Sequence, residues 1–211
     1  MTKEKIISEK NIFNFQLLII ALYVAFQIFS DILSTKITYL PILKLAVDGG
    51  TIIYPLTFTL RDFVHKSCGK RNAQKLIFVS ALINIIMVGL FFVVGIMPAS
   101  SDWPHQLAYE AILMPIWRIT LASIVAEVIS ELIDTEVFDA FYKKAKEFLG
   151  VFVSNGIALF IDSIIFSAIA FAGVLPFSIV VEIAISNIFI KAILTIISIP
   201  SIKFIPRLKV K

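Results

Sequence analysis

The stretch LIFVSALINIIMVGLFFVVGIMPASS, residues 76–101, contains 26 residues without a charged side chain. An α-helix needs about 20 mostly apolar residues to cross the hydrocarbon core of a bilayer, which is about 30 Å thick. Two further stretches, residues 11–30 and 163–181, contain 20 and 19 uncharged residues. These three stretches predict helices that span a membrane.

The composition of the whole chain agrees with this prediction. Of its 211 residues, 59% are hydrophobic and only 16% are charged. Soluble proteins have about 45–50% apolar and about 25% charged residues. The composition therefore excludes an ordinary cytosolic enzyme, a disordered chain and a disulfide scaffold.

We predict an all-α polytopic membrane protein with one domain over residues 1–211. Three more stretches are apolar but interrupted by charges, at about 50–66, 111–134 and 183–202. Together with the uncharged stretches they predict six transmembrane helices, at about 12–34, 50–67, 74–98, 109–134, 150–174 and 178–200.

The distribution of Lys and Arg predicts the orientation. Fourteen of them lie in the N-terminal segment, in the loops after the second and fourth predicted helices and in the C-terminal segment. The loops on the other side carry only Lys36 and Lys44. Cytoplasmic loops are enriched in Lys and Arg, so both termini are predicted to be cytoplasmic and the location is predicted to be the inner membrane. The basic residues are topology signals, and no basic stripe remains for nucleic acid.

Eight charged residues fall inside the predicted helices. They are Arg61, Asp62, Arg118, Glu127, Glu131, Asp134, Asp162 and Lys191. Each costs about 2.5–3.5 kcal/mol at the bilayer centre, roughly 20 kcal/mol in total if all faced lipid. We therefore expect them to face one another across a hydrated chamber that admits a flat, nitrogen-rich guest. The alternative is a set of static ion pairs that lock helices together.

Helical spacing supports a shared polar interior. Glu127 and Glu131 share a stripe on the fourth helix, Asn155 and Asp162 share a face of the fifth, and the sixth carries Asn187 and Lys191. Phe58 lines up with Asp62 on the second helix, whereas Arg118 falls opposite Glu127 on its own helix. Asp31, Asp48 and Glu182 are expected near the outer surface and are left out of the predicted site.

No motif for catalysis, metal binding or nucleotide binding is present. The single cysteine, Cys68, excludes an internal disulfide, and neither His65 nor His105 has a partner at metal-ligand spacing. HExxH, GxSxG and Walker-type runs are missing from the sequence. We therefore predict no cofactor, no metal and no catalytic residue.

Four blocks of the sequence resemble the queuosine precursor transporters, also called the vitamin uptake transporter family or DUF165. The first, GGTIIYPLTFTLRDFVHKSCG at residues 49–69, carries Gly50, Pro55, Phe58, Asp62 and Gly69 at the positions of the family pattern. The other three blocks place the family positions as follows: Arg118, Ala122, Ser123, Asp134, Val137 and Phe138 in residues 117–141; Asp162 and Ile169 to Phe171 in residues 154–173; and Lys191 in the last block. Members of the family vary at the positions of Glu131 and Asn187.

The resemblance implies import of 7-deazaguanine bases such as preQ0, preQ1 or queuine, for making the modified tRNA nucleoside queuosine. A carboxylate can accept the adjacent N–H donors of a guanine-like edge, and an amide or cation can donate to its carbonyl. The predicted substrate-binding residues are Phe58, Asp62, Arg118, Glu127, Glu131, Asn155, Asp162, Asn187 and Lys191. Among them, Asp62, Glu127 and Asp162 are the expected acceptors, and Arg118 and Lys191 the donors or counter-charges.

Several alternatives remain open. The family is also similar to the six-helix substrate-binding components of energy-coupling-factor importers, so the chain is alternatively the substrate-binding component of an ATP-driven importer for another heterocycle or vitamin. A proton gradient, a sodium gradient or a separate ATPase module all fit as the energy source, and a homodimer fits as the assembly. Less expected are an intramembrane enzyme that uses the paired carboxylates Glu127 and Glu131, and a membrane assembly factor that transports nothing.

Overall fold

The computed structural model describes residues 9–41, 43–142 and 147–198. The chain is mostly helical within these ranges, with one two-stranded sheet. The elements in chain order are α1 (Glu9–Leu33), β1 (Ile37–Tyr39), β2 (Ala46–Asp48), the 3₁₀ helix η1 (Gly49–Ile52), α2 (Tyr54–Cys68), α3 (Lys70–Gly95), α4 (Gln106–Leu113), α5 (Ile116–Tyr142), α6 (Glu147–Phe171) and α7 (Phe177–Ser198).

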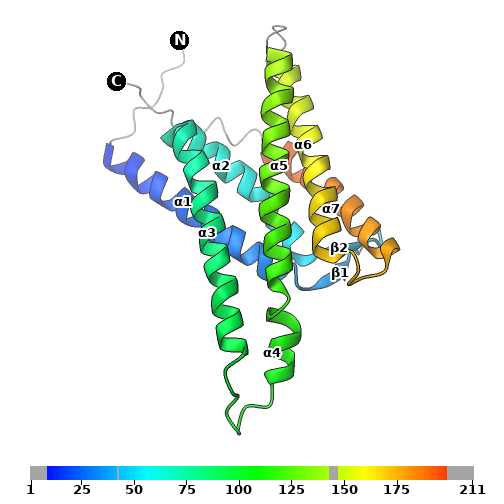
Figure 1. Ribbon diagram of the computed structural model, residues 1–211. Coiled ribbons are helices and arrows are strands. Elements are labelled where there is room, and N and C mark those ends of the chain that lie inside the picture. Colours follow the sequence, from blue (N-terminus) through cyan, green and yellow to red (C-terminus); the bar gives the residue numbers. More distant parts are fainter. Residues whose placement is uncertain (1–8, 42, 143–146, 199–211) are drawn as a thin grey trace.

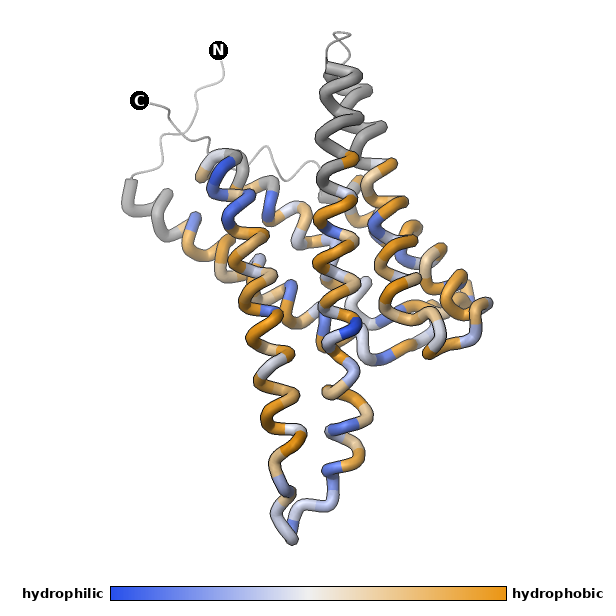
Figure 2. Tube along the Cα trace, viewed as in Figure 1, coloured by the Kyte–Doolittle hydropathy of each residue, from blue (hydrophilic) through white to orange (hydrophobic). Residues whose placement is uncertain are grey.

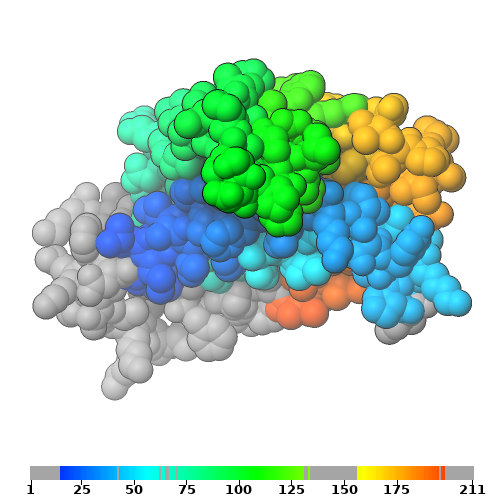
Figure 3. Space-filling view, turned by 90° about the horizontal axis from the view of Figure 1, so that it is seen from below, coloured from blue at the N-terminus to red at the C-terminus, as the bar shows by residue number. Residues whose placement is uncertain are grey.

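The two longest helices among the described residues, α3 and α5, form the long axis of the molecule. Figure 1 shows α3 and α5 running side by side in opposite directions, joined at the lower end through α4. The most extensive helix pairing is between α5 and α6, and α1 packs against α2. In the view from below, the end of the molecule where α3 is joined to α4 lies next to α1, the β hairpin and the start of α7 (Figure 3).

Four helical segments are long and apolar enough to cross a membrane: Phe15–Leu33, Arg71–Gly95, Gln106–Ser130 and Phe177–Leu194. The apolar part of α6 among the described residues, Gly156–Phe171, is shorter, and α2 has only 15 residues. Figure 2 shows hydrophobic residues along most of α3 and along much of the coloured parts of α5 and α6. The chain is therefore a multi-pass α-helical membrane protein, as its composition indicated.

The expectation of a purely helical fold missed the β hairpin between α1 and η1. Its strands pair antiparallel, with Ile37 opposite Asp48 and Tyr39 opposite Ala46. Strand β2 is buried and packs on α7, where the Ala46 N–H donates to Glu182 at 3.0 Å. Each strand has only three residues, too few for an alternating pattern to stand out in the sequence.

The helix predicted at 109–134 is two helices in the structure. The break falls between Leu113 and Ile116, at Pro115, which has no N–H to donate to the preceding turn. Downstream of it, α5 continues to Tyr142. The helix predicted at 50–67 begins later, at Tyr54, because η1 occupies the preceding residues.

Two glycines set the path of the chain around α2. A Cβ on Gly50 would lie 2.1 Å from Ser34 Oγ and 2.5 Å from the carbonyl oxygen of Ser30. Only a residue without a side chain therefore lets η1 lie directly on α1. Gly69 separates α2 from α3 and has a φ of 89°, a left-handed conformation that favours glycine.

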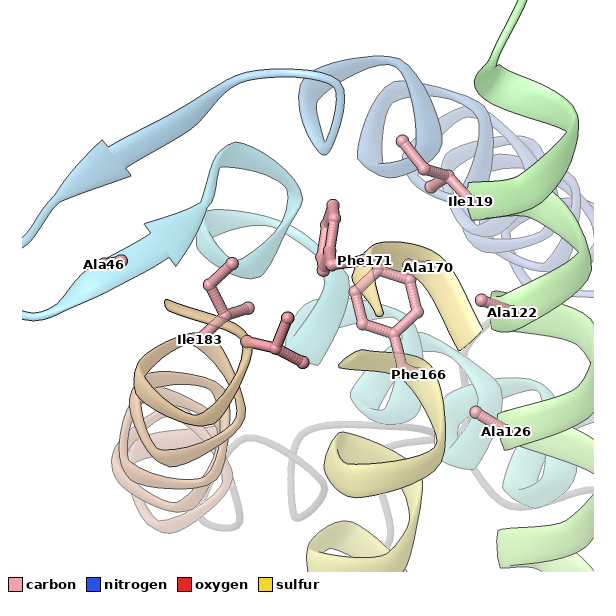
Figure 4. Packing of buried hydrophobic residues seen from close by; sticks show 9 residues of the cluster. Ala46, Ile119, Ala122, Ala126, Phe166, Ala170, Phe171 and Ile183 are labelled. Carbon is pink, nitrogen blue, oxygen red and sulfur yellow. The ribbon is translucent and has the colours of Figure 1, made fainter. Parts of the chain in front are cut away.

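Small residues bring the central helices together. Ala122 and Ala126 of α5 and Ala170 of α6 are buried in one cluster with two phenylalanines of α6, Phe166 and Phe171. Figure 4 shows both rings between α5 and the Ile183 side chain of α7. Small side chains allow close helix packing in a membrane, where association rests on van der Waals contact.

Candidate functional site

A small polar cavity lies where α1, η1, α2, α5, α6 and α7 meet. It encloses about 10 Å³. This is close to the room that one water molecule needs, so a larger guest enters only if the helices move apart. The residues that line the cavity are Ser30, Ser34, Asp48, Gly50, Thr51, Tyr54, Ser123, Phe166, Asn187 and Lys191.

The wall formed by α6 and α7 carries a buried ion pair. Lys191 Nζ lies 2.5 Å from Asp162 Oδ2, and the side chains are 3% and 1% exposed. The ammonium group lies 4.7 Å from the centre of the Tyr54 ring and 5.9 Å from that of Phe166. The other oxygen, Asp162 Oδ1, is buried and has no hydrogen-bond partner among the described residues. Two predicted site residues thus meet here, joined to one another.

Asp48 holds the opposite end of the cavity together. Its carboxylate caps η1, accepting from the Thr51 N–H at 3.2 Å and from the Thr51 hydroxyl at 2.8 Å. It also accepts from Ser34 Oγ of α1 at 2.7 Å. The Thr51 hydroxyl also contacts Asn187 Oδ1 of α7. Asp48 therefore ties α1 and η1 together, and Thr51 links them to α7.

Asp31 joins α1 to α5. It is 1% exposed and accepts from Thr120 Oγ1 at 2.7 Å and from Ser123 Oγ at 2.9 Å. The predicted site leaves out Asp31 and Asp48, but both are buried and Asp48 lines the cavity. Hydrophobicity alone does not reveal that chain segments fold back over them.

Glu127 lies one turn beyond Ser123 on α5 and makes a second contact with α1. Its Oε1 accepts from the Tyr23 hydroxyl at 2.9 Å, and Gln27 Nε2 donates to the same hydroxyl at 3.2 Å. Glu127 is 8% exposed and does not line the cavity. The predicted acceptor thus lies at the interface of α1 and α5.

Arg118, which lies opposite Glu127 on its own helix, pairs with carbonyl groups of another helix. Its Nε donates to the carbonyl of Ile169 at 2.6 Å, and its Nη2 donates to the carbonyl of Ala172. These carbonyls belong to the end of α6, where the last turn of a helix leaves its oxygens without intrahelical partners. Arg118 is therefore a cap for α6 and not a lining residue of the cavity.

The remaining predicted residues divide into two groups. Asn187 lines the cavity with Lys191, as predicted, whereas Phe58 contacts the Tyr54 ring edge-on and the guanidinium of Arg61 at 5.5 Å. The side chains of Asp62, Glu131 and Asn155 lie outside the described residues.

Sequence reasoning missed the uncharged lining residues. Thr51 and Tyr54 lie in the first resembling block, and Phe166 lies in the third. A search for charges inside helices passes over them, although a four-residue spacing from Asp162 does place Phe166 on the same face of α6. Within the described ranges, no group of three or more His, Cys, Asp or Glu side chains is placed to hold a metal.

Comparison with known sequences now identifies the family. The family described as "Putative vitamin uptake transporter" matches residues 48–205, about three quarters of the chain. The chain belongs to the vitamin uptake transporter family. The matched region includes η1, Asn187 and Lys191 and thus most of the cavity wall, and it also includes Asp162.

A curated relative carries a more specific name. The "Probable queuosine precursor transporter" of Bacillus subtilis (strain 168) is 28% identical over 158 residues, covering 72% of this chain and 68% of that protein. No solved structure matches the chain. The vitamin uptake transporter family and this relative confirm the resemblance drawn from the four sequence blocks.

Proposed function

We propose that this chain is an inner-membrane importer of queuosine precursors, the 7-deazaguanine bases preQ0, preQ1 or queuine. It crosses the membrane six times with both termini in the cytoplasm, because α2 and α6 complete the four longer spans. The relative from Bacillus subtilis supports the substrate class. The proposal extends that relative's name to this chain at 28% identity.

The observation that carries the proposal is the cavity beside the Asp162–Lys191 pair. Its wall offers the ammonium group of Lys191 and two aromatic rings, and next to that ammonium lies Asp162, whose Oδ1 has no partner among the described residues. The N–H donors of a guanine-like base can donate to the carboxylate oxygen, and its carbonyl can accept from the ammonium group. The flat face of the base can stack on the aromatic rings. A phosphate or dicarboxylate does not match them, since Asp48 and Asp162 would repel it.

The irregular backbone beside the cavity also supports the proposal. The cavity lies where η1 gives way to α2, so the backbone there is a short 3₁₀ turn followed by a helix of 15 residues. Transporters commonly build their substrate sites from such interrupted helices near the middle of the membrane. Irregular backbone at that depth is tolerated where it lines a protein cavity.

Uptake of labelled base tests the proposal. Cells that lack their own carrier and cannot make the base would express the chain, with labelled preQ0, preQ1 and queuine supplied outside. We expect uptake by the wild type and none by Asp162→Asn. Glu182→Gln on α7 is the matched control, because its amide oxygen can still accept from Ala46, and it should transport normally.

Two outcomes would overturn the proposal. Absence of uptake for all three bases, with the protein present in the membrane, would exclude these substrates. Uptake that persists in Asp162→Asn would exclude the site. Purified protein in liposomes separates an independent carrier from the substrate-binding component of an ATP-driven importer, because only the former moves the base without another protein.

A further inference from the structure

The Asp162–Lys191 pair leaves hydrogen-bonding capacity unused. A carboxylate accepts through two oxygens, and an ammonium group has three N–H donors. Only Oδ2 of Asp162 and one donor of Lys191 are joined, while Oδ1 is buried without a partner among the described residues. A buried ion pair is stable only when its remaining donors and acceptors are also satisfied. The pair therefore has hydrogen-bonding capacity for one additional donor and one additional acceptor, which a guest can use once the helices move apart.

A lactam edge supplies that combination. In a lactam the N–H and the C=O lie side by side on one edge of the ring. The N–H can donate to Asp162 Oδ1 while the C=O accepts from Lys191 Nζ, which closes a ring of hydrogen bonds around the existing contact. The two charges stay together, so binding does not require the buried pair to be separated, a step that would cost several kcal/mol.

The surroundings of the pair favour a flat guest. The rings of Tyr54 and Phe166 both lie next to the ammonium group, at 4.7 Å and 5.9 Å, and both line the cavity. Aromatic rings of this kind stack on planar heterocycles, whatever the base. The carboxylate and the ammonium then determine which edge of the heterocycle points toward α6 and α7.

We propose that the intact Asp162–Lys191 pair reads the lactam edge of the transported base, with Oδ1 accepting the lactam N–H and Nζ donating to the lactam carbonyl. This inference rests on the proposed function. It differs from binding in which the carboxylate accepts both N–H donors of a guanine edge, because here Oδ2 stays with Lys191. The exocyclic amino group of the base is then not read by Asp162.

Two analogues of preQ0 separate these modes of binding. Isothermal calorimetry on the purified full-length chain in lipid nanodiscs would compare preQ0, its 1-methyl derivative and its 2-desamino derivative. Loss of a hydrogen bond to a charged group predicts that the 1-methyl derivative binds about 10- to 100-fold more weakly. The 2-desamino derivative keeps the lactam edge and should bind within about threefold of preQ0.

The outcomes distinguish this inference from the proposed function. If preQ0 binds and is transported but the 2-desamino derivative loses as much affinity as the 1-methyl derivative, the carboxylate reads both donors and the inference fails alone. If the 1-methyl derivative binds as well as preQ0, the pair does not read the edge. If none of the bases binds or is transported, the proposed function fails as well.

Calorimetry on variants of the full-length chain in lipid nanodiscs gives a second test. Asp162→Asn should weaken preQ0 binding strongly and remove the difference between preQ0 and its 1-methyl derivative. Glu182→Gln should keep both the affinity and the difference. Because the analogues are also compared on the wild-type protein, the inference stays testable even if Asp162→Asn does not fold.

Discussion

The contact between α1 and α5 and the contact between α6 and α7 each bury a carboxylate, but they satisfy it differently. Asp31 accepts from two neutral hydroxyls, Thr120 and Ser123, one on each of its oxygens. Asp162 has one cationic partner, Lys191, on one oxygen and none among the described residues on the other. A carboxylate engaged on both oxygens has its strongest acceptor positions occupied by the helices it joins, whereas one with an open oxygen keeps the capacity to accept from a further donor.

The same contrast extends along each interface. At the α1–α5 interface a neutral hydroxyl again donates to a carboxylate, because the Tyr23 hydroxyl donates to Glu127. Beside Asp162, two aromatic rings take the place of further polar partners. Under the proposed function, the α1–α5 interface is a fixed interface that holds helices together, and the α6–α7 interface is the one that contacts the substrate.

The largest effect is expected from Lys191→Met. It leaves Asp162 as a buried charge without its cation, which should lower the free energy of unfolding by about 3–5 kcal/mol and abolish uptake. Thermal melts in detergent and uptake of labelled base measure the two effects. The double variant Asp162→Asn with Lys191→Met removes both charges and should regain most of the stability but none of the uptake. Uptake by the double variant would remove the pair from the site.

Asp31→Ala comes next and tests the fixed interface. The variant deletes two hydrogen bonds to a charged group, and each such bond contributes about 1.5–3 kcal/mol to the free energy of unfolding. The net loss is smaller than the sum of the two, because part of it is compensated. We expect a lower melting temperature, together with near-normal uptake per folded molecule. Thr120→Ala with Ser123→Ala is the complementary variant from the α5 side. Loss of uptake without loss of stability in Asp31→Ala would show that both interfaces respond to the substrate.

Gly50→Ala tests the connection between the α1–α5 and α6–α7 interfaces. This connection runs through η1, which lies on α1 and whose Thr51 contacts α7. The added methyl group would meet a backbone oxygen of Ser30 at 2.5 Å, so η1 must shift. Overpacking of this kind typically costs about 1–3 kcal/mol. Uptake should fall with stability, as measured by melting and by labelled base. Unchanged values of both would show that η1 is free to move away from α1.

The smallest effect is expected from Arg118→Gln, at the end of α6 away from the cavity. The variant loses hydrogen bonds from a cation to the carbonyls of Ile169 and Ala172, which should cost about 1 kcal/mol. Uptake should be unchanged. Melting curves and uptake rates check both expectations, and a strong loss of uptake would return Arg118 to the site, as the sequence had suggested.

The sequence predicted the class of the fold and part of the site. Uncharged stretches revealed the membrane helices, because apolar length is a property of the chain itself. Asp162 and Lys191 were found because a charge inside a membrane helix needs a partner wherever that helix lies. Thr51, Tyr54 and Phe166 were not predicted, since uncharged residues in apolar stretches carry no such signal.

The amino-acid sequence alone therefore established the class of a multi-pass helical membrane protein and the family, whereas its six spans stay a prediction beside the four long apolar segments among the described residues. Only the tertiary structure decided which charges meet: Lys191 with Asp162, Arg118 with the end of α6, and Asp31 with two hydroxyls of α5. It also decided that η1 and the β hairpin fold over α1 and α7. The physical reason is that helix length depends on local hydrophobicity, whereas the pairing of buried charges depends on which helices pack together.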